Sequence, residues 1–278
     1  MWDAIITLAL AEDIGTGDIT SIVTVPAGTQ ARGIILAKSA GVLSGLEAAR
    51  ATFHHVDPAL RFMPRLADGA RLAPGQTIAD VSGPARSLLS AERVALNLLQ
   101  RLSGVATLTA AYVAVVAGTQ ARIVDTRKTT PGLRLLEKAA VRHGGGFNHR
   151  FGLAGGVLIK DNHLAAIGGA NRVRRAIQQA RAGAPHTLRI EVEVTTLDQA
   201  REALDAGADI IMLDNMDLAT MRAAVAEIAG RALLEASGGI TLEHVRAVAE
   251  TGVDLISAGA LTHSAPALDI SLDVSLEG

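Results

Sequence analysis

After about residue 105, short apolar runs alternate with amphipathic segments of helical periodicity, and no other feature constrains the fold of this chain as strongly. The apolar runs are predicted to be strands, and the last four begin roughly 20 residues apart, the length of one strand–helix unit. The predicted strands are residues 122–125, 156–159, 189–193, 209–213, 232–235 and 253–256. Repeats of this kind favour a parallel sheet, closed into a barrel or doubly wound.

The first hundred residues lack this regular alternation and are predicted to form an α+β domain. The predicted elements are a helix at 3–12, strands at 32–38 and 41–43, and a helix at 88–101 with Ser90 as its N-cap. We therefore expect an N-terminal α/β sandwich domain over residues 1–104 and an α/β barrel domain over residues 105–278. As an alternative for the end of the chain, the last residues of the second domain pack back on the first domain.

Composition narrows the class of protein. Apolar residues make up 49% of the chain and aromatic residues 2%, so Ala, Val, Ile and Leu must form the core, which suits parallel strands buried on both faces. A net charge of −2 gives no general attraction to nucleic acid or to an anionic membrane. The shortage of aromatic side chains argues against a base-stacking surface. Since the chain has no cysteine, disulfides and thiolate metal ligands are excluded.

One stretch, residues 102–121, carries no charge and is about long enough to span a membrane. It is rich in alanine and contains several Gly, Ser and Thr residues, so a buried helix of a protein core is the preferred interpretation. The N-terminus has no basic segment ahead of its first apolar run. We therefore expect a cytoplasmic protein with no membrane partner.

Polar and charged side chains follow almost every predicted strand of the second half. These groups are Asp125 to Thr129, Lys160 to His163, Glu193, Asp214 with Asn215, Glu235 to Gly239, and Ser257 to Gly259. In barrel enzymes the catalytic groups lie at the carboxyl ends of the strands. Because nearly every strand end carries such a group, we expect one shared active-site face.

Charge is segregated along this half of the chain. Residues 122–160 carry eight Lys or Arg and two acids, whereas residues 191–217 carry eight acids and one Arg. Arg127, Lys128 and Lys160 directly follow apolar strand residues and are expected to point into the barrel mouth. Arg134, Lys138 and Arg142 have helical spacing and are interpreted as a solvated helix face. A cationic wall of this kind indicates an anionic, multiply charged substrate.

Two carboxylates, Glu193 and Asp214, end consecutive strands and favour a hard cation such as Mg²⁺. A structural pair bonded to Lys or Arg is the alternative. Glu191 has the same strand parity as Glu193, so either glutamate could be the ligand. The glycine-rich loops at 237–239 and 257–260 each lie between a strand and a helix, where backbone N–H groups can bind a phosphate.

Long motifs in the second half carry a family resemblance. They are Asp125-Thr-Arg-Lys-Thr-Thr-Pro-Gly-Leu-Arg134, the run from Lys138 to Leu153, Leu158-Ile-Lys-Asp-Asn-His163, Glu191 to Val194, Leu213 to Met216, Glu235 to Gly239 and Gly259 to Ser264. Residues 12–20 and 91–93 extend the match into the first half. The chain closely resembles the quinolinate phosphoribosyltransferases, which are also called nicotinate-nucleotide pyrophosphorylases (carboxylating).

The resemblance implies an α/β sandwich domain followed by an incomplete α/β barrel of about seven strands. It implies a homodimer whose active sites are completed across subunits. It also implies Mg²⁺-dependent conversion of quinolinate and phosphoribosyl pyrophosphate to nicotinate mononucleotide, pyrophosphate and CO₂, a step of NAD biosynthesis.

The resemblance also implies roles for individual residues. Arg127, His149, Arg150 and Lys160 would bind the two quinolinate carboxylates, with Thr126 and Lys128 beside the substrates and Arg93 reaching in from the partner subunit. Glu193 and Asp214 would hold the ribose hydroxyls and Mg²⁺, and they form the expected catalytic set together with Lys128 and Lys160. The 5′-phosphate would lie on two loops, formed by Ser237, Gly238 and Gly239 and by Ser257, Ala258 and Gly259. His54 and His55 receive no role. His163 and His263 are interpreted as structural residues or as supports behind the residues that contact the ligand.

Three alternatives stay open at this point. The first is a molybdenum-transport-associated paralogue, which shares the fold. A paralogue with another substrate is expected to lose the elements that bind the dicarboxylate. This chain keeps both of them, Asn148 to Arg150 and Ile159 to His163. A barrel aldolase or isomerase would use Lys160 as a Schiff base. A non-catalytic phosphosugar-binding protein would bind ligand without releasing pyrophosphate or CO₂.

Overall fold

The computed structural model describes residues 3–276, which divide into two compact units. The first unit combines three separate segments of the chain: residues up to Ala110, Thr130–Gly145 and the C-terminal residues from Ala265. The second unit contains Ala111–Thr129 and Gly146–Ser264. Each unit is described by itself below.

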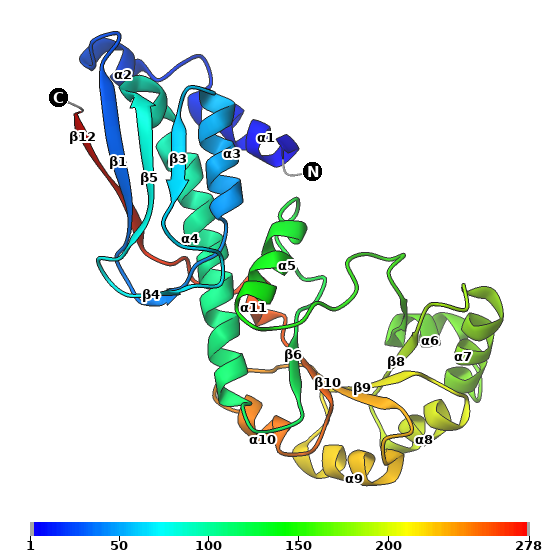
Figure 1. Ribbon diagram of the computed structural model, residues 1–278. Coiled ribbons are helices and arrows are strands. Elements are labelled where there is room, and N and C mark those ends of the chain that lie inside the picture. The colour runs from blue at the N-terminus through cyan, green and yellow to red at the C-terminus, as the bar shows by residue number, and fades with distance from the viewer. Residues whose placement is uncertain (1–2, 277–278) are drawn as a thin grey trace. The chain divides into compact units, whose positions relative to one another are not determined.

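The first unit is a mixed α/β layer structure (Figure 1). Its helices are α1 (Asp3–Ile14), α2 (Ile19–Thr24), α3 (Leu46–Val56), α4 (Ala85–Val115, whose last residues belong to the second unit) and α5 (Arg134–His143). Its strands are β1 (Gln30–Ala37), β2 (Gly41–Val42), β3 (Arg61–Pro64), β4 (Arg71–Leu72), β5 (Thr77–Pro84) and β12 (Ile270–Leu276).

An antiparallel sheet with the strand order β12-β1-β5-β3 is the centre of this unit. Strand β12 comes from the end of the described chain and pairs with β1 along its length, from Ala31 opposite Leu276 to Ala37 opposite Ile270. Apolar side chains of the sheet pack with buried residues of α3 and α4, such as Phe53 and Leu99. This shared apolar core holds the two helices on the sheet.

The second unit is built from strand–helix repeats (Figure 1). Its strands are β6 (Arg122–Val124), β7 (Val157–Ile159), β8 (Ile190–Val194), β9 (Ile210–Asp214), β10 (Leu233–Ser237) and β11 (Leu255–Ser257). Its helices are α6 (Asp161–Ile167), α7 (Arg172–Gly183), α8 (Leu197–Asp205), α9 (Leu218–Ile228), α10 (Val245–Ala249) and α11 (Ala260–His263).

All strand pairs of this unit are parallel, in the order β6-β11-β10-β9-β8-β7. The sheet is buried, as the composition indicates, and all five residues of β8 are buried. Side-chain caps start two of the crossing helices. Thr196 accepts a hydrogen bond from the backbone of Gln199 at α8, and Asp217 accepts one from the backbone of Thr220 at α9.

The α/β fold class is confirmed. Six strands of the described chain form the parallel sheet, and a single parallel bridge between Val124 and Phe147 adds one further residue beside β6. Among residues 3–276, no hydrogen-bonded pairing joins the outer strands β6 and β7.

Helix α4 differs from the predicted helix at 88–101. It spans 31 residues from Ala85 to Val115, so Ser90 lies inside the helix, where its hydroxyl donates to the carbonyl of Arg86. The N-cap prediction was therefore wrong. By length and composition α4 is apolar enough to cross a membrane, but half of its most apolar window is buried inside the structure. Leu88, Leu99 and other residues of α4 belong to the apolar core of the sheet, as expected for a core helix.

Helix α5 also differs from its prediction. Lys138 was interpreted as part of a solvated face with Arg134 and Arg142, but it is fully buried. Glu137 beside it is also fully buried and accepts hydrogen bonds from Arg101 and from the hydroxyl of Thr130. Since α5 belongs to the first unit, part of the positive charge in residues 122–160 belongs to that unit and not to the strand–helix repeats.

Candidate active site

The carboxyl ends of the parallel strands meet at one edge of the second unit. Ser237 at the end of β10 is opposite Asp214 at the end of β9, and Ser257 at the end of β11 is opposite Val124 at the end of β6. Side chains and loops that follow these strands are therefore neighbours in space although they lie far apart in the sequence. This arrangement is the shared face that the pattern of strand ends predicts.

A cavity of about 650 Å³ opens at this edge. Its volume is in the range of small-molecule sites. Twelve residues that the sequence singles out line it: Thr126, Arg127, Lys128, His149, Arg150, Lys160, Glu193, Asp214, Ser237, Gly238, Gly239 and Ser257. The structure thus brings most of the predicted site together in one place.

Three predicted residues lie elsewhere. Gly259 lines a smaller adjoining cavity of about 200 Å³, which also contains Lys128 and the loop at Ser237. Ala258 is buried, and its backbone N–H donates to the carbonyl of Val124. Arg93 belongs to the first unit, where its side chain is 57% exposed, and its predicted contribution across a dimer stays a prediction.

Cationic side chains form one wall of the larger cavity. Arg150 donates from Nη1 to the carbonyl of Gly156 at 3.0 Å, which fixes the guanidinium. Burial, followed by the nearby positive charge of Arg127, lowers the pKa of Arg150 below its ordinary value. Two guanidinium groups held close together repel each other, so this wall is prepared for a ligand with negative charges.

Lys160 connects this wall to the acidic side of the cavity. Its Nζ lies 2.9 Å from Oε2 of Glu193, so the two side chains form an ion pair. The backbone N–H of Lys160 donates to Nδ1 of His163 at 2.9 Å, which fixes the start of α6. His163 thus contacts the backbone at the start of α6.

Glu193 and Asp214 lie on adjacent strands, and both line the cavity. Lys160 binds Oε2 of Glu193, and the side-chain amide of Asn215 donates to Oδ2 of Asp214 at 2.8 Å. These carboxylates present oxygen donors only, which is the ligand type that Mg²⁺ prefers. The donor set therefore fits a magnesium ion.

The glycine-rich loop after β10 approaches Asn215 closely. Gly238 has a φ of 91°, in the left-handed region that favours glycine, and a Cβ there would lie 2.3 Å from Oδ1 of Asn215. The backbone N–H of Asn215 donates to the carbonyl of Ser237 at 2.9 Å. Asn215 itself has a φ of 53°. The loop and Asn215 thus form one rigid rim that carries the side chain of Asp214.

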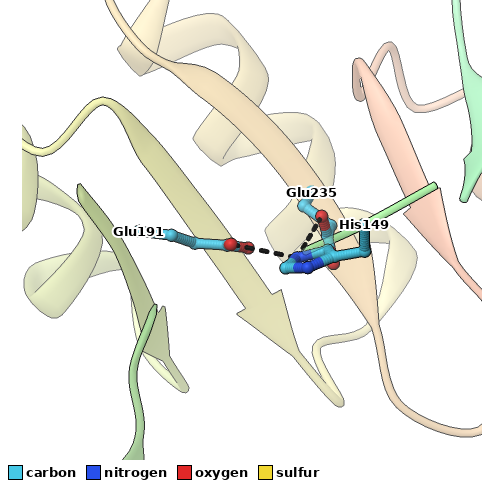
Figure 2. A group of neighbouring side chains, drawn as sticks. All are labelled: His149, Glu191 and Glu235. Carbon is cyan, nitrogen blue, oxygen red and sulfur yellow. Dashed lines mark ion pairs between the residues drawn. The ribbon is translucent and has the colours of Figure 1, made fainter. Parts of the chain in front are cut away.

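Three neighbouring side chains form a group that we call the buried triad: His149, Glu191 and Glu235 (Figure 2). Nε2 of His149 lies 3.0 Å from Oε2 of Glu191 and 3.6 Å from Oε2 of Glu235. Burial, followed by the negative charge of Glu191, raises the pKa of Glu235 to about 7. Glu191 therefore contacts His149, while Glu193 on the same strand lines the cavity beside Lys160.

Sequence reasoning noted Asn215 and Glu235 at strand ends but assigned them no role, and both line the cavity. A signal for Glu235 was present. It has the same strand parity as Ser237, which was predicted to face the ligand, and it interrupts an otherwise apolar strand. His263, interpreted as structural, lines the smaller cavity with its Nε2 close to the position of Gly259.

The fold and the site define a class. A parallel α/β sheet whose carboxyl edge combines guanidinium groups, carboxylates and a glycine-rich loop is the architecture of an enzyme for phosphorylated, anionic substrates. The chain matches two family models: "Quinolinate phosphoribosyl transferase, N-terminal domain" over residues 18–103 and "Quinolinate phosphoribosyl transferase, C-terminal domain" over residues 105–273.

Individual relatives agree with these models. The chain is 49% identical over 265 residues to the probable nicotinate-nucleotide pyrophosphorylase [carboxylating] of Bacillus subtilis, which covers 95% of this chain and 90% of that protein. It is 47% identical to the Mycobacterium leprae nicotinate-nucleotide pyrophosphorylase [carboxylating] over 96% of this chain and 94% of that one. The crystal structure of NadC from Streptococcus pyogenes matches with a TM-score of 0.94 and 44% identity, over 99% of this chain and 97% of that chain. The chain belongs to the quinolinate phosphoribosyltransferase family.

Proposed function

We propose that this chain transfers a phosphoribosyl group from phosphoribosyl pyrophosphate to quinolinate, and releases pyrophosphate and CO₂ to give nicotinate mononucleotide. The observation that carries the proposal is the single cavity of about 650 Å³, which combines a cationic wall, two carboxylates and a glycine-rich loop. A dicarboxylate, a ribose and a phosphate are the ligands that these three surfaces fit. The Bacillus subtilis and Mycobacterium leprae relatives carry names for this same reaction.

The cationic wall would bind the acceptor. Arg127, Arg150 and Lys160 supply the positive charges for the two carboxylates of quinolinate, and guanidinium groups bind such carboxylates in a bidentate manner. Holding both carboxylates fixes the plane of the pyridine ring and directs its nitrogen toward the sugar. This positioning would increase the rate because the ring nitrogen and the anomeric carbon of the ribose are already held in a reactive orientation.

The opposite side would bind the donor. Glu193 and Asp214 would accept hydrogen bonds from the ribose hydroxyls, and the backbone N–H groups around Gly238 would bind the 5′-phosphate. Lys128 lines both cavities, so its ammonium group is available to the departing pyrophosphate. The positive charge of Lys128 would neutralise part of the negative charge that develops on the leaving group.

We also propose that Mg²⁺ binds at Glu193 and Asp214, where it would supply positive charge to the pyrophosphate when bound. As the C–O bond to pyrophosphate breaks, the ring nitrogen attacks the anomeric carbon and becomes a positively charged pyridinium. The adjacent carboxylate then leaves as CO₂, and its bonding electrons remain on the ring carbon beside the pyridinium nitrogen. That carbon takes up a proton to complete nicotinate mononucleotide.

A homodimer in the cytoplasm, with Arg93 of one subunit reaching the cavity of the other, is part of this proposal. The side chain of Arg93 is largely exposed within its own unit, which leaves it available for a partner subunit. Sedimentation of the purified protein tests the dimer, and cell fractionation tests the location.

The proposal predicts that the purified protein converts quinolinate and phosphoribosyl pyrophosphate with Mg²⁺ into equal amounts of pyrophosphate and CO₂, and that chelation of Mg²⁺ stops turnover. In Arg150→Ala the KM for quinolinate should rise about 100-fold, because loss of a charged hydrogen bond costs roughly 1.5–3 kcal/mol. The KM for phosphoribosyl pyrophosphate should change little. Wild-type protein that releases no CO₂, or an Arg150→Ala variant with unaltered quinolinate kinetics, would contradict the assignment.

A further inference from the structure

Both ring nitrogens of His149 are engaged by neighbouring groups of the protein. Nδ1 accepts the backbone N–H of Arg150 at 2.8 Å, and Nε2 lies 3.0 Å from Oε2 of Glu191. A ring nitrogen that accepts an N–H donor must carry a lone pair and no proton. The ring proton of His149 therefore lies on Nε2, where it points to the carboxylate of Glu191 (Figure 2).

We propose that Glu191 is a positioning residue: it holds His149 in the Nε2–H tautomer, and His149 in turn holds the backbone of Arg150 at the cavity wall. The effect on activity rests on the proposed function, in which Arg150 binds a carboxylate of quinolinate. In this arrangement His149 acts through Arg150, and neither ring nitrogen is left to bind the substrate directly.

Other contacts of the segment from Asn148 to Arg150 show that more than one strand holds it in position. Oδ1 of the buried Asp125, just after β6, accepts the backbone N–H of His149 at 2.8 Å. Oδ2 of Asp125 accepts the side-chain amide of Asn148 at 2.6 Å. Asp125 thus anchors the backbone of this segment from β6, while Glu191 anchors the imidazole ring from β8. Without Glu191 the ring would lose its fixed orientation but the segment would keep its attachment to β6.

The two carboxylates of the buried triad are not equivalent. Glu191 is closer to Nε2 of His149, whereas both carboxylate oxygens of Glu235 are buried without a hydrogen-bond partner. The charged groups that face this pair are His149 and Lys160 in addition to the two glutamates. Two buried carboxylates at such close range do not both ionise readily. Burial and the negative charge of Glu191 raise the pKa of Glu235.

A metal ion is the competing explanation for the triad. One donor atom from each of its residues lies within 4.8 Å of the others, which one ion could bridge. A histidine bound to a metal through Nε2 normally donates its Nδ1–H to a neighbouring acceptor. Here Nδ1 faces the N–H donor of Arg150, so a metal-bound ring would place two N–H groups against each other. The hydrogen-bond pattern therefore fits a proton on Nε2 and does not fit a metal.

The first test measures steady-state kinetics of the full-length protein with three variants. Glu191→Leu removes the acceptor, and we expect the KM for quinolinate to rise at least tenfold while the KM for phosphoribosyl pyrophosphate stays within twofold. Glu191→Gln keeps an acceptor oxygen and should recover part of this loss. Glu235→Gln is the matched control, an uncharged isostere in the same triad, and its KM for quinolinate should rise less than that of Glu191→Leu. A general loss of structure would raise both KM values together, so this split separates positioning from unfolding.

The second test does not depend on activity. Nitrogen-15 NMR of histidine-labelled protein, with the His149 signals assigned by comparison with His149→Gln, reports the tautomer directly. We expect Nε2–H in the wild type and in Glu235→Gln, and a tautomer mixture in Glu191→Leu.

Four results would overturn the inference: an Nδ1–H ring in the wild type, a Glu191→Leu tautomer like that of the wild type, a Glu235→Gln effect on quinolinate as large as that of Glu191→Leu, or a stoichiometric metal ion that both Glu191→Leu and Glu235→Leu lose. If the wild type did not use quinolinate, the proposed function would fail. The tautomer comparison would still decide whether Glu191 positions His149.

Discussion

At the residue scale, contacts between individual atoms determine the shape of the cavity rim. An added methyl group at Gly238 would overlap the side-chain amide of Asn215, and Asn215 in turn donates to Asp214. The loop that would bind a phosphate and the carboxylate that would bind a ribose are therefore mechanically connected. A substitution at Gly238 should therefore also displace the carboxylate of Asp214.

We predict that Gly238→Ala lowers kcat/KM for phosphoribosyl pyrophosphate by about tenfold or more, because a displacement of about 1 Å at a site can cost up to 100-fold in rate. Gly230→Ala is the control, since Gly230 has a φ of 75° but no atom within 4 Å of an added Cβ. Both variants should lose similar stability through their left-handed backbone, and only Gly238→Ala should lose activity. Equal kinetics in the two variants would show that the rim does not transmit the displacement.

At this scale the sequence predicted which residues gather, but not how they touch. Lys160, Glu193 and Asp214 could be placed because each directly follows or ends a buried apolar run, and parallel strands bring their carboxyl ends together. The contact of His149 with Glu191 could not be predicted. It joins a loop to a strand far along the chain, and no local periodicity encodes that distance.

At the element scale, the six strands of the parallel sheet were predictable within about two residues because burial on both faces leaves continuous apolar runs. Strands β3, β4, β5 and β12 of the first unit were not predicted. The ends of α4 and the burial of Lys138 in α5 were not predictable, because helical spacing does not reveal which face another element will cover.

A buried charge inside the antiparallel sheet was not predicted either. Asp80 in β5 is buried, and it pairs with Arg32 of β1 and with Arg65 just after β3. This ion pair cluster spans three neighbouring strands.

We predict that Asp80→Asn lowers the stability of the protein by about 1 kcal/mol at neutral pH, near the upper range for partly exposed ion pairs. The hydrogen bonds from Arg32 and Arg65 hold the pKa of Asp80 below its ordinary value of 3.8. Its contribution is therefore fully present above that value and is lost as the pH falls through the lowered pKa. Urea unfolding as a function of pH checks this, with the exposed Asp273→Asn on β12 as the control. The difference between wild type and Asp80→Asn should shrink in acid, and a difference that grows there would contradict the prediction.

At the scale of the whole molecule, the first unit is assembled from both ends of the described chain. Gly104 in α4 shows how closely the returning C-terminal segment approaches, because an added Cβ would lie 2.0 Å from the carbonyl oxygen of Pro266. Glycine inside a helix costs about 1 kcal/mol relative to alanine. The absence of a side chain here is explained by the approach of that segment.

We predict that Gly104→Ala destabilises the protein by about 1–3 kcal/mol, the usual cost of overpacking a closed core. Gly183→Ala is the matched control, because Gly183 also lies in a helix and an added Cβ meets nothing within 4 Å. That variant should be as stable as the wild type or up to about 1 kcal/mol more stable. Thermal unfolding of both variants measures the difference, and equal melting temperatures would refute the close approach.

The pairing of β12 with β1 also sets an order in time. A ribosome completes the entire parallel sheet of the second unit before it adds residues 270–276, which supply the outer strand of the first unit. Until then one edge of β1 exposes its backbone N–H and C=O groups, and such an edge readily pairs with a foreign strand. Residues 270–276 therefore protect this edge of the N-terminal sheet once they have been made, and every strand of the parallel sheet is made before them.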